Sequence, residues 1–150
     1  MTRRFLARLA LAALVAAASP LAAQDTPLDR WRADPAQVFA ADEVLLADLD
    51  YTARALVVFA DSPNQPQYQE QLRLIAAGAA ELALRDVIVL VDSDPRSGSD
   101  ARETLRPHGF SLVLIDKDGT VVFRKPDPWD AREISRQIDK LPSRRQEIRG

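Results

Sequence analysis

The polar segment that follows the first continuous apolar run holds residue types that can do chemistry. Asp61, Ser62, Asn64 and Gln65 lie within five positions, and His108 is the one histidine of the chain. A serine hydroxyl beside a histidine can act as a nucleophile with its base. The Gly-x-Ser-x-Gly pattern of hydrolase elbows is missing around this serine. These polar types are also preferred in helix caps and turns, which is the interpretation that we favour.

A second chemistry at this segment is ligand binding. The start of a helix presents unpaired backbone N–H groups, which suit an anion or a polar ligand. A helix is expected directly after the segment, and the loop around His108 is expected to flank the same place. We therefore treat Asp61, Ser62, Asn64, Gln65 and His108 as candidate ligand-binding residues, and we assign no catalytic residue.

The chain has no cysteine, so thiol chemistry and disulfides are excluded. Two acidic pairs, Asp92 with Asp94 and Asp116 with Asp118, raise the question of a metal site. The second pair lies in a predicted hairpin turn and lacks the further ligands of a calcium loop. The first pair would need carboxylates from elsewhere. We expect no metal and no cofactor.

Residues 143–150 form a basic C-terminal tail. Arg144 and Arg145 are candidate partner-binding residues, because guanidinium groups make bidentate contacts with anionic groups. A solvated tail after a helix is the alternative, since cations suit a helix C-terminus.

Residues 1–23 predict a secretory signal peptide, with Arg3 and Arg4 before a short apolar run and small residues at the cleavage point after Ala23. We expect a periplasmic or secreted protein with no stable membrane insertion after cleavage. Losing Arg3, Arg4 and Arg8 would change the formal net charge from −2 to −5, which disfavours nucleic acid as a partner. The expected partner is an unidentified envelope protein or a small ligand.

The first part of the expected domain, after a leader over residues 24–50, is a strand–helix–strand unit. Residues 55–61 and 87–91 are continuous apolar runs, typical of strands buried on both faces. Between them, apolar residues recur at helical spacing over 66–85. Within the leader, Asp34–Pro35 predicts the start of an N-terminal helix.

The second part of the domain, which as a whole spans residues 51–142, is a hairpin followed by a helix. Ser97 or Ser99 can cap a short helix before it. Apolar runs at 110–115 and 120–123 flank an Asp-Gly turn, and the spacing of Asp130 and Glu133 matches a capping box. A βαβ half followed by a ββα half predicts a thioredoxin-like three-layer α/β sandwich around a four-stranded mixed sheet.

The chain resembles a family of small secreted bacterial domains of unknown function that are peroxiredoxin-like in sequence. It is also similar to the DUDES-type domain of extracellular animal proteins with sushi repeats or coiled coils. The resemblance covers about residues 50–149, and the matching segments are Arg54–Pro63, Tyr68–Gln71, Leu112–Gly119, Arg124–Asp130 and Arg132–Glu147. It implies a thioredoxin-like fold and no established activity. Thioredoxin-like enzymes place their cysteines where this chain has Asp61–Pro66.

Three hypotheses follow. The first, which we favour, is a non-catalytic binding or interaction module of the cell envelope. The second is a non-thiol, hydrolase-like enzyme that uses the Asp61–Ser62 loop with His108, which requires these side chains to converge. The third is a structural partner in an envelope complex, which requires a contiguous exposed apolar patch.

Overall fold

The computed structural model describes residues 25–150, and the predicted signal peptide lies outside them. The central sheet has five strands in the order β1-β3-β2-β4-β5. Strand β2 (Arg54–Phe59) pairs in parallel with β3 (Val87–Asp92) and antiparallel with β4 (Ser111–Ile115), and β5 (Val121–Lys125) continues the hairpin. The predicted βαβ and ββα halves are therefore both present, and the thioredoxin-like arrangement is confirmed.

The fifth strand corrects the predicted four-stranded sheet and the predicted N-terminal helix. Residues Val38–Ala40 form β1, which pairs in parallel with β3 and buries Phe39 opposite Leu90. The helix lies earlier, as α1 (Pro27–Ala33), where Thr26 and Asp29 form a capping box. The mixed spacing of apolar residues after Asp34 belongs to a strand and the 3-10 turns η1 (Ala41–Glu43) and η2 (Leu46–Leu49), because pairing with a buried strand outweighs weak local helical preference.

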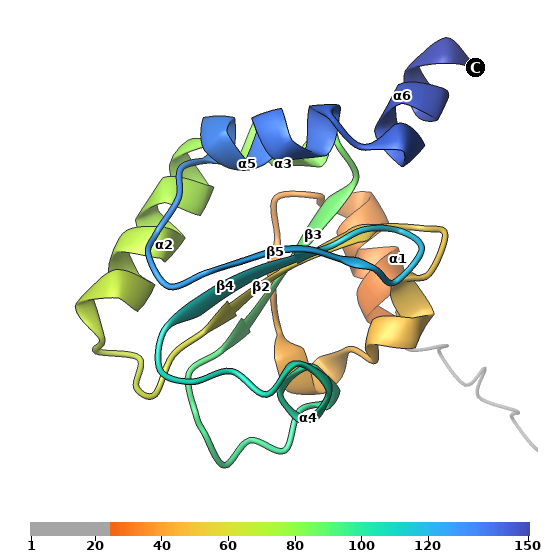
Figure 1. Ribbon diagram of the computed structural model, residues 1–150. Coiled ribbons are helices and arrows are strands. Elements are labelled where there is room, and N and C mark those ends of the chain that lie inside the picture. Colours follow the sequence, from red (N-terminus) through yellow and green to blue (C-terminus); the bar gives the residue numbers. More distant parts are fainter. Residues whose placement is uncertain (1–24) are drawn as a thin grey trace, which may run out of the picture.

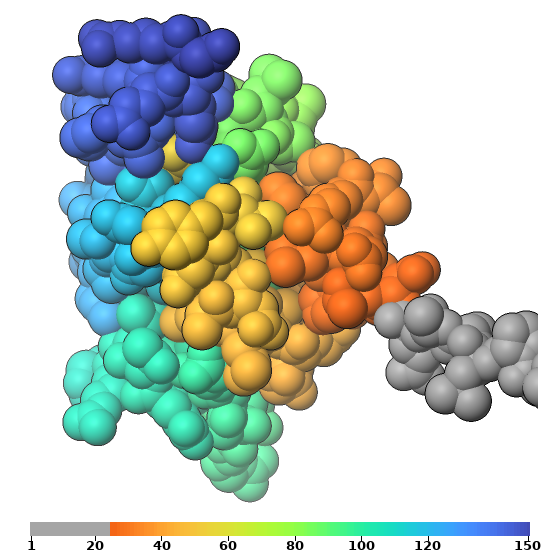
Figure 2. All heavy atoms as spheres, turned by 90° about the vertical axis from the view of Figure 1, so that its right-hand side faces the viewer, coloured from red at the N-terminus to blue at the C-terminus, as the bar shows by residue number. Residues whose placement is uncertain are grey.

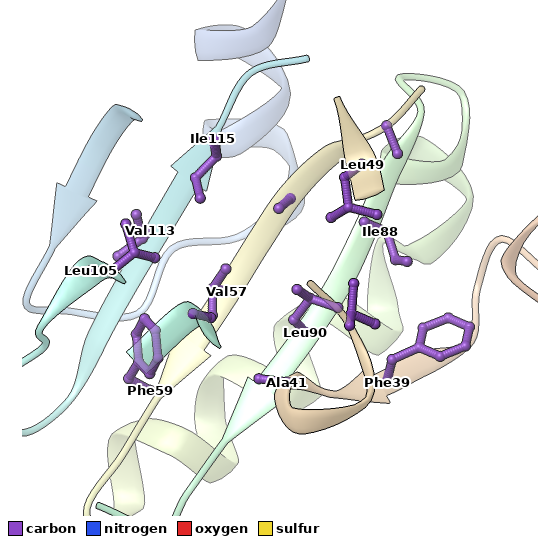
Figure 3. Close-up of a cluster of buried hydrophobic side chains, with 14 of the residues drawn as sticks. Phe39, Ala41, Leu49, Val57, Phe59, Ile88, Leu90, Leu105, Val113 and Ile115 are labelled. Carbon is purple, nitrogen blue, oxygen red and sulfur yellow. The ribbon is translucent and has the colours of Figure 1, made fainter. Parts of the chain in front are cut away.

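Side chains alternate along β2, so that its two faces build two cores. Ala55, Val57 and Phe59 face one core, which α1, the 3-10 turns and α4 (Asp100–Leu105) cover (Figures 1 and 3). Leu56 and Val58 face the other core, under α2 (Pro66–Ala77), α3 (Ala79–Ala83) and α5 (Ala131–Asp139). Every residue of β2 is buried, as expected for a strand covered on both sides.

The predicted helix over 66–85 is two helices, with a break at Gly78. A Cβ atom at Gly78 would lie 2.1 Å from the Cβ atom of Ala131, so glycine allows the start of α5 to approach closely here. The capping box of α5, between Asp130 and Glu133, is present as predicted.

The C-terminal segment is a helix and not the predicted tail. Pro142, expected to end the preceding helix, stands at the first turn of α6 (Pro142–Arg149), where its missing N–H is not needed. Figure 1 shows α6 beside the end of α5, and α4 lies at the opposite end of the sheet. The space-filling view shows the same separation, with the C-terminal segment at the top and the region around α4 at the bottom (Figure 2).

Candidate functional site

The segment Asp61–Gln65 follows the carboxyl end of β2, at the edge of the sheet where ligands bind in many α/β proteins. The side chain of Gln65 turns back, and its Oε1 accepts a hydrogen bond from Asp61 N at 3.1 Å. Ser62 Oγ accepts one from Asn64 N, also at 3.1 Å. Two of the four side chains therefore hold their own loop, which supports the turn interpretation, while Asp61 and Asn64 are exposed to solvent.

His108 lies on the neighbouring loop, between α4 and β4, and is exposed. The two loops meet, because a Cβ atom at Gly109 would lie 3.9 Å from Asp61 Oδ2. Within residues 25–150, no hydrogen bond joins Ser62 to His108. The sequence thus identified two loops that are neighbours in space, but the described structure does not join their side chains into a nucleophile–base pair.

Behind this edge lies an ion pair that sequence reasoning missed. The side chain of Asp92, only 2% exposed, contacts Arg102 with its Oδ1 at 2.9 Å from Nη2. The same nitrogen donates to the carbonyl oxygen of Ala60 at 3.1 Å, so Arg102 fastens the end of β2 to the end of β3. Ser97 and Ser99 also donate to Asp92, each at 2.6 Å.

The charge state of Asp92 is set by two opposing effects. Burial alone would raise the pKa of Asp92, but the hydrogen bonds from Arg102, Ser97 and Ser99 outweigh it, and the pKa lies below its ordinary value. The carboxylate that we considered as a metal ligand is thus a charged structural partner of an arginine. One sequence signal was available, an arginine that sits three residues after the serine N-cap of a short helix.

A cavity of about 380 Å³ opens beside the His108 loop, at the same edge of the sheet. Arg106, Arg124 and Lys125 are the cationic residues of its lining, and none of them has a carboxylate within 4.0 Å among residues 25–150. Arg124 Nη2 donates to the carbonyl oxygen of Leu105 at 2.7 Å. The full lining is Leu105, Arg106, His108, Phe110, Ser111, Arg124, Lys125 and Pro126. Of these, sequence reasoning had singled out His108 alone.

The opposite edge of the sheet carries a second buried charge cluster, around Arg54. This side chain is fully buried, with Nε 3.0 Å from Asp116 Oδ1 and Nη2 2.9 Å from Glu147 Oε1. Ser143 Oγ accepts a further hydrogen bond from Arg54 at 3.0 Å. Since Ser143 and Glu147 belong to α6, this cluster holds the C-terminal helix against Arg54, at the start of β2.

Glu147 is the most strongly perturbed acid of this cluster. Partial burial would raise its pKa, but hydrogen bonds from Arg54, Lys117 and Arg144 lower it from 4.5 to about 2. The ion pair between Lys117 Nζ and Glu147 Oε1 measures 2.9 Å. Glu147 is therefore charged at neutral pH, and it shares the neutralisation of Arg54 with Asp116 and that of Lys117 with Asp86.

The two arginines proposed as partner-binding residues have different surroundings. Arg144 contacts Glu147 at 3.2 Å and donates to the carbonyl oxygen of Leu84 at 3.1 Å, so its guanidinium serves the packing of α6. Arg145 is exposed and forms no ion pair within the described chain. Partner binding stays a prediction for both residues, and Arg145 is the more accessible of the two to a partner.

The other two members of the acidic pairs considered as metal ligands, Asp94 and Asp118, lie in turns. Asp94 accepts a hydrogen bond from Arg96 N, and Asp118 accepts one from Thr120 N, each at 2.9 Å. Across residues 25–150, no three His, Cys, Asp or Glu side chains gather in a way that could hold a metal ion. The helices of this region are also too short or too polar to span a bilayer.

Trp129 lies in the connector between β5 and α5. It is partly buried and packs against the core under α5, as expected for a large aromatic side chain. Its ring centroid is 5.2 Å from that of Phe123, and Lys125 Nζ lies 4.4 Å above it. The tryptophan thus holds the ammonium group of Lys125 on the face of the sheet opposite to Arg124.

Comparison with known proteins gives a family and two distant similarities. The chain is 29% identical to coiled-coil domain-containing protein 80 of Danio rerio, over 71% of this chain. It spans only 16% of the length of that relative. Among solved structures, it is similar to thioredoxin peroxidase I of Plasmodium yoelii, with 18% identity and a TM-score of 0.49 over 71% of this chain and 85% of that one. The family model described as domain of unknown function DUF4174 matches residues 45–147, and the chain therefore belongs to the DUF4174 family.

Proposed function

We propose that this protein is an exported, non-enzymatic binding module of the cell envelope. Its ligand face is the edge of the sheet formed by residues 61–65 and the loop around His108. The observation that carries the proposal is the contrast at this edge. Ser62 Oγ is engaged by its own loop at 3.1 Å, while a cavity of about 380 Å³ opens next to the neighbouring loop. A concave site with a few polar groups suits binding.

The chemistry of the edge supports binding over turnover. The chain has no cysteine, so the position after β2 carries no thiolate. Arg102, a cation beside that position, is neutralised by Asp92 and donates a hydrogen bond to the carbonyl oxygen of Ala60. What remains accessible are hydrogen-bonding and cationic groups, which can hold a ligand without transforming it.

Export is the second part of the proposal. It rests on the sequence pattern of residues 1–23, a basic start followed by a short apolar run and small residues. A fold without cysteine suits an oxidising compartment, because its stability does not depend on redox conditions.

The test is equilibrium dialysis of residues 24–150 against the small-molecule fraction of the producing cells, with mass spectrometry of both compartments. We expect one or more compounds to be retained on the protein side with unchanged mass. Formation of a new compound that depends on the protein, and that is lost in Ser62→Ala or His108→Ala, would establish the hydrolase-like alternative. Equal concentrations of every compound on both sides would refute a small-ligand binding module.

A further inference from the structure

We propose that the cavity next to His108 is a binding site for a compact polyanion, either a phosphorylated or a polycarboxylate small molecule. The proposal rests on the proposed function and specifies its ligand. It starts from the charge of the lining, in which Arg106, Arg124, Lys125 and His108 are basic and no side chain is acidic. Such a lining is unexpected in a chain whose formal net charge is negative.

The pairing of cations elsewhere in the domain strengthens this argument. Where cations are buried or half-buried at other places in the fold, carboxylates accompany them, as Asp116 and Glu147 accompany Arg54 and Asp92 accompanies Arg102. At the cavity, the exposed Arg106 and Arg124 and the half-buried Lys125 have no carboxylate within 4.0 Å among the described residues. Like charges brought together repel each other, and a bound anion would remove that repulsion.

Two of the cationic side chains are also held in place by contacts within the fold, and the anchored Arg124 favours a specific site over a diffuse patch. Arg124 comes from β5, and its Nη2 is fixed by the carbonyl oxygen of Leu105 at 2.7 Å. The ammonium group of Lys125 rests above the ring of Trp129 at 4.4 Å. Arg106 is the C-cap of α4 with a positive φ of 47°, and its exposed side chain forms no hydrogen bond or ion pair among the described residues. Preorganised donors such as Arg124 lose little entropy when they bind.

The volume and the donors define the chemical class. A space of about 380 Å³ lies within the range of small-molecule sites. Guanidinium groups bind carboxylate and phosphate oxygens through two parallel hydrogen bonds, and Ser111 adds a hydroxyl at the base of the site. The guanidinium groups of Arg106 and Arg124 match a ligand that carries at least two negative charges, such as a diphosphate or a tricarboxylate.

The experiment is a calorimetric titration of residues 24–150 with pyrophosphate and, separately, with citrate, at constant ionic strength set with sodium chloride. Saturable binding of either probe is expected, and the stronger of the two shows whether phosphate or carboxylate chemistry is preferred. Arg106→Gln should weaken that binding by about tenfold or more, because a charge-assisted hydrogen bond is lost. Arg149→Gln removes the same charge at the far end of α6 and should leave the affinity unchanged.

Arg124→Gln also breaks the contact with Leu105, so its thermal unfolding is measured first, and Arg124→Lys serves as a second variant that keeps the charge. The inference is overturned if neither probe binds, or if Arg149→Gln weakens binding as much as the cavity variants do. Its failure is separable from that of the proposed function. A neutral compound retained in the dialysis experiment, with no response to pyrophosphate or citrate, would leave the binding module standing without a polyanion site.

Discussion

Changing Glu147 to glutamine removes one charge from the cluster that joins α6 to the sheet, while it keeps the shape of the side chain. Arg54, fully buried, would keep Asp116 as its ion-pair partner and lose Glu147. Lys117 and Arg144 would lose the same carboxylate. We expect the Glu147→Gln variant to unfold more readily than the wild type, because buried cations would be left with one negative charge fewer.

The size of the effect follows from the pKa of Glu147, which falls from 4.5 to about 2 in the folded protein. Since one pH unit corresponds to about 1.4 kcal/mol, the ceiling is roughly 3.4 kcal/mol of unfolding free energy. The Glu147 side chain is 26% exposed, so solvent screening reduces this figure. We expect a loss of about 2 kcal/mol at pH 7.

The contribution of Glu147 to the unfolding free energy should depend on pH in a definite direction. A carboxyl group with a lowered pKa stabilises the folded state above its ordinary pKa, and this contribution is lost as the pH falls toward the folded value. The difference in unfolding free energy between the wild type and Glu147→Gln should therefore be constant from pH 7 to about pH 5 and should shrink as the pH approaches 2.

The assay is urea unfolding of both proteins, followed by circular dichroism between pH 7 and pH 2.5. Glu70→Gln is the matched control, because Glu70 pairs with Arg73 on an exposed helix surface and should be replaceable without measurable loss. The reasoning is refuted if Glu147→Gln is as stable as the wild type at pH 7, or if the gap persists undiminished at the lowest pH.

Two further changes test the packing. Asp92→Asn should lower the unfolding free energy by about 3 kcal/mol at neutral pH, because it leaves the buried guanidinium of Arg102 without its anion. Asp94→Asn, on the exposed loop, is the control and should have little effect. Equal unfolding free energies of the two variants in urea would contradict this. Gly78→Ala should lower the unfolding free energy by roughly 1–3 kcal/mol, because the new Cβ atom would lie 2.1 Å from the Cβ atom of Ala131. Adding Ala131→Gly should restore part of that stability. If thermal unfolding shows no recovery in the double variant, the loss has another cause.

Periodicity predicted most of the fold because the sheet strands carry their signal locally. The run at residues 55–60 is continuously apolar, which is typical of a strand covered on both faces. The short strand β1 escaped prediction because three residues contain too little pattern, and its pairing with β3 depends on a partner about fifty positions away.

The charged clusters escaped prediction for a related reason. Arg54 stands directly before an apolar run, and an arginine at this position is typical of a strand end exposed to solvent. Its burial depends on Asp116 and on Glu147, more than sixty and more than ninety positions away, and neither spacing has a recognisable period. The same holds for the cavity, where helix α4, its following loop and strand β5 contribute separate cations.

Pro142 shows how a local rule can be applied at the wrong position. Proline ends a helix that precedes it, but it also suits the first turn of a helix that follows. The charged residues after it carry no clear apolar face, so periodicity alone predicts a tail there and not a helix. Their helix is held through ion pairs with the end of the sheet instead, chiefly through Glu147.

We propose that the edge of the sheet near residues 61–65 and His108 is the ligand face of this protein. The most direct measurement is a map of amide chemical shifts for ¹⁵N-labelled residues 24–150, recorded with and without the fraction retained in dialysis. The account predicts that the shifted amides cluster in residues 61–65, 105–111 and 124–126, with α6 unchanged. Shifts confined to α6, or spread evenly over both ends of the sheet, would contradict it.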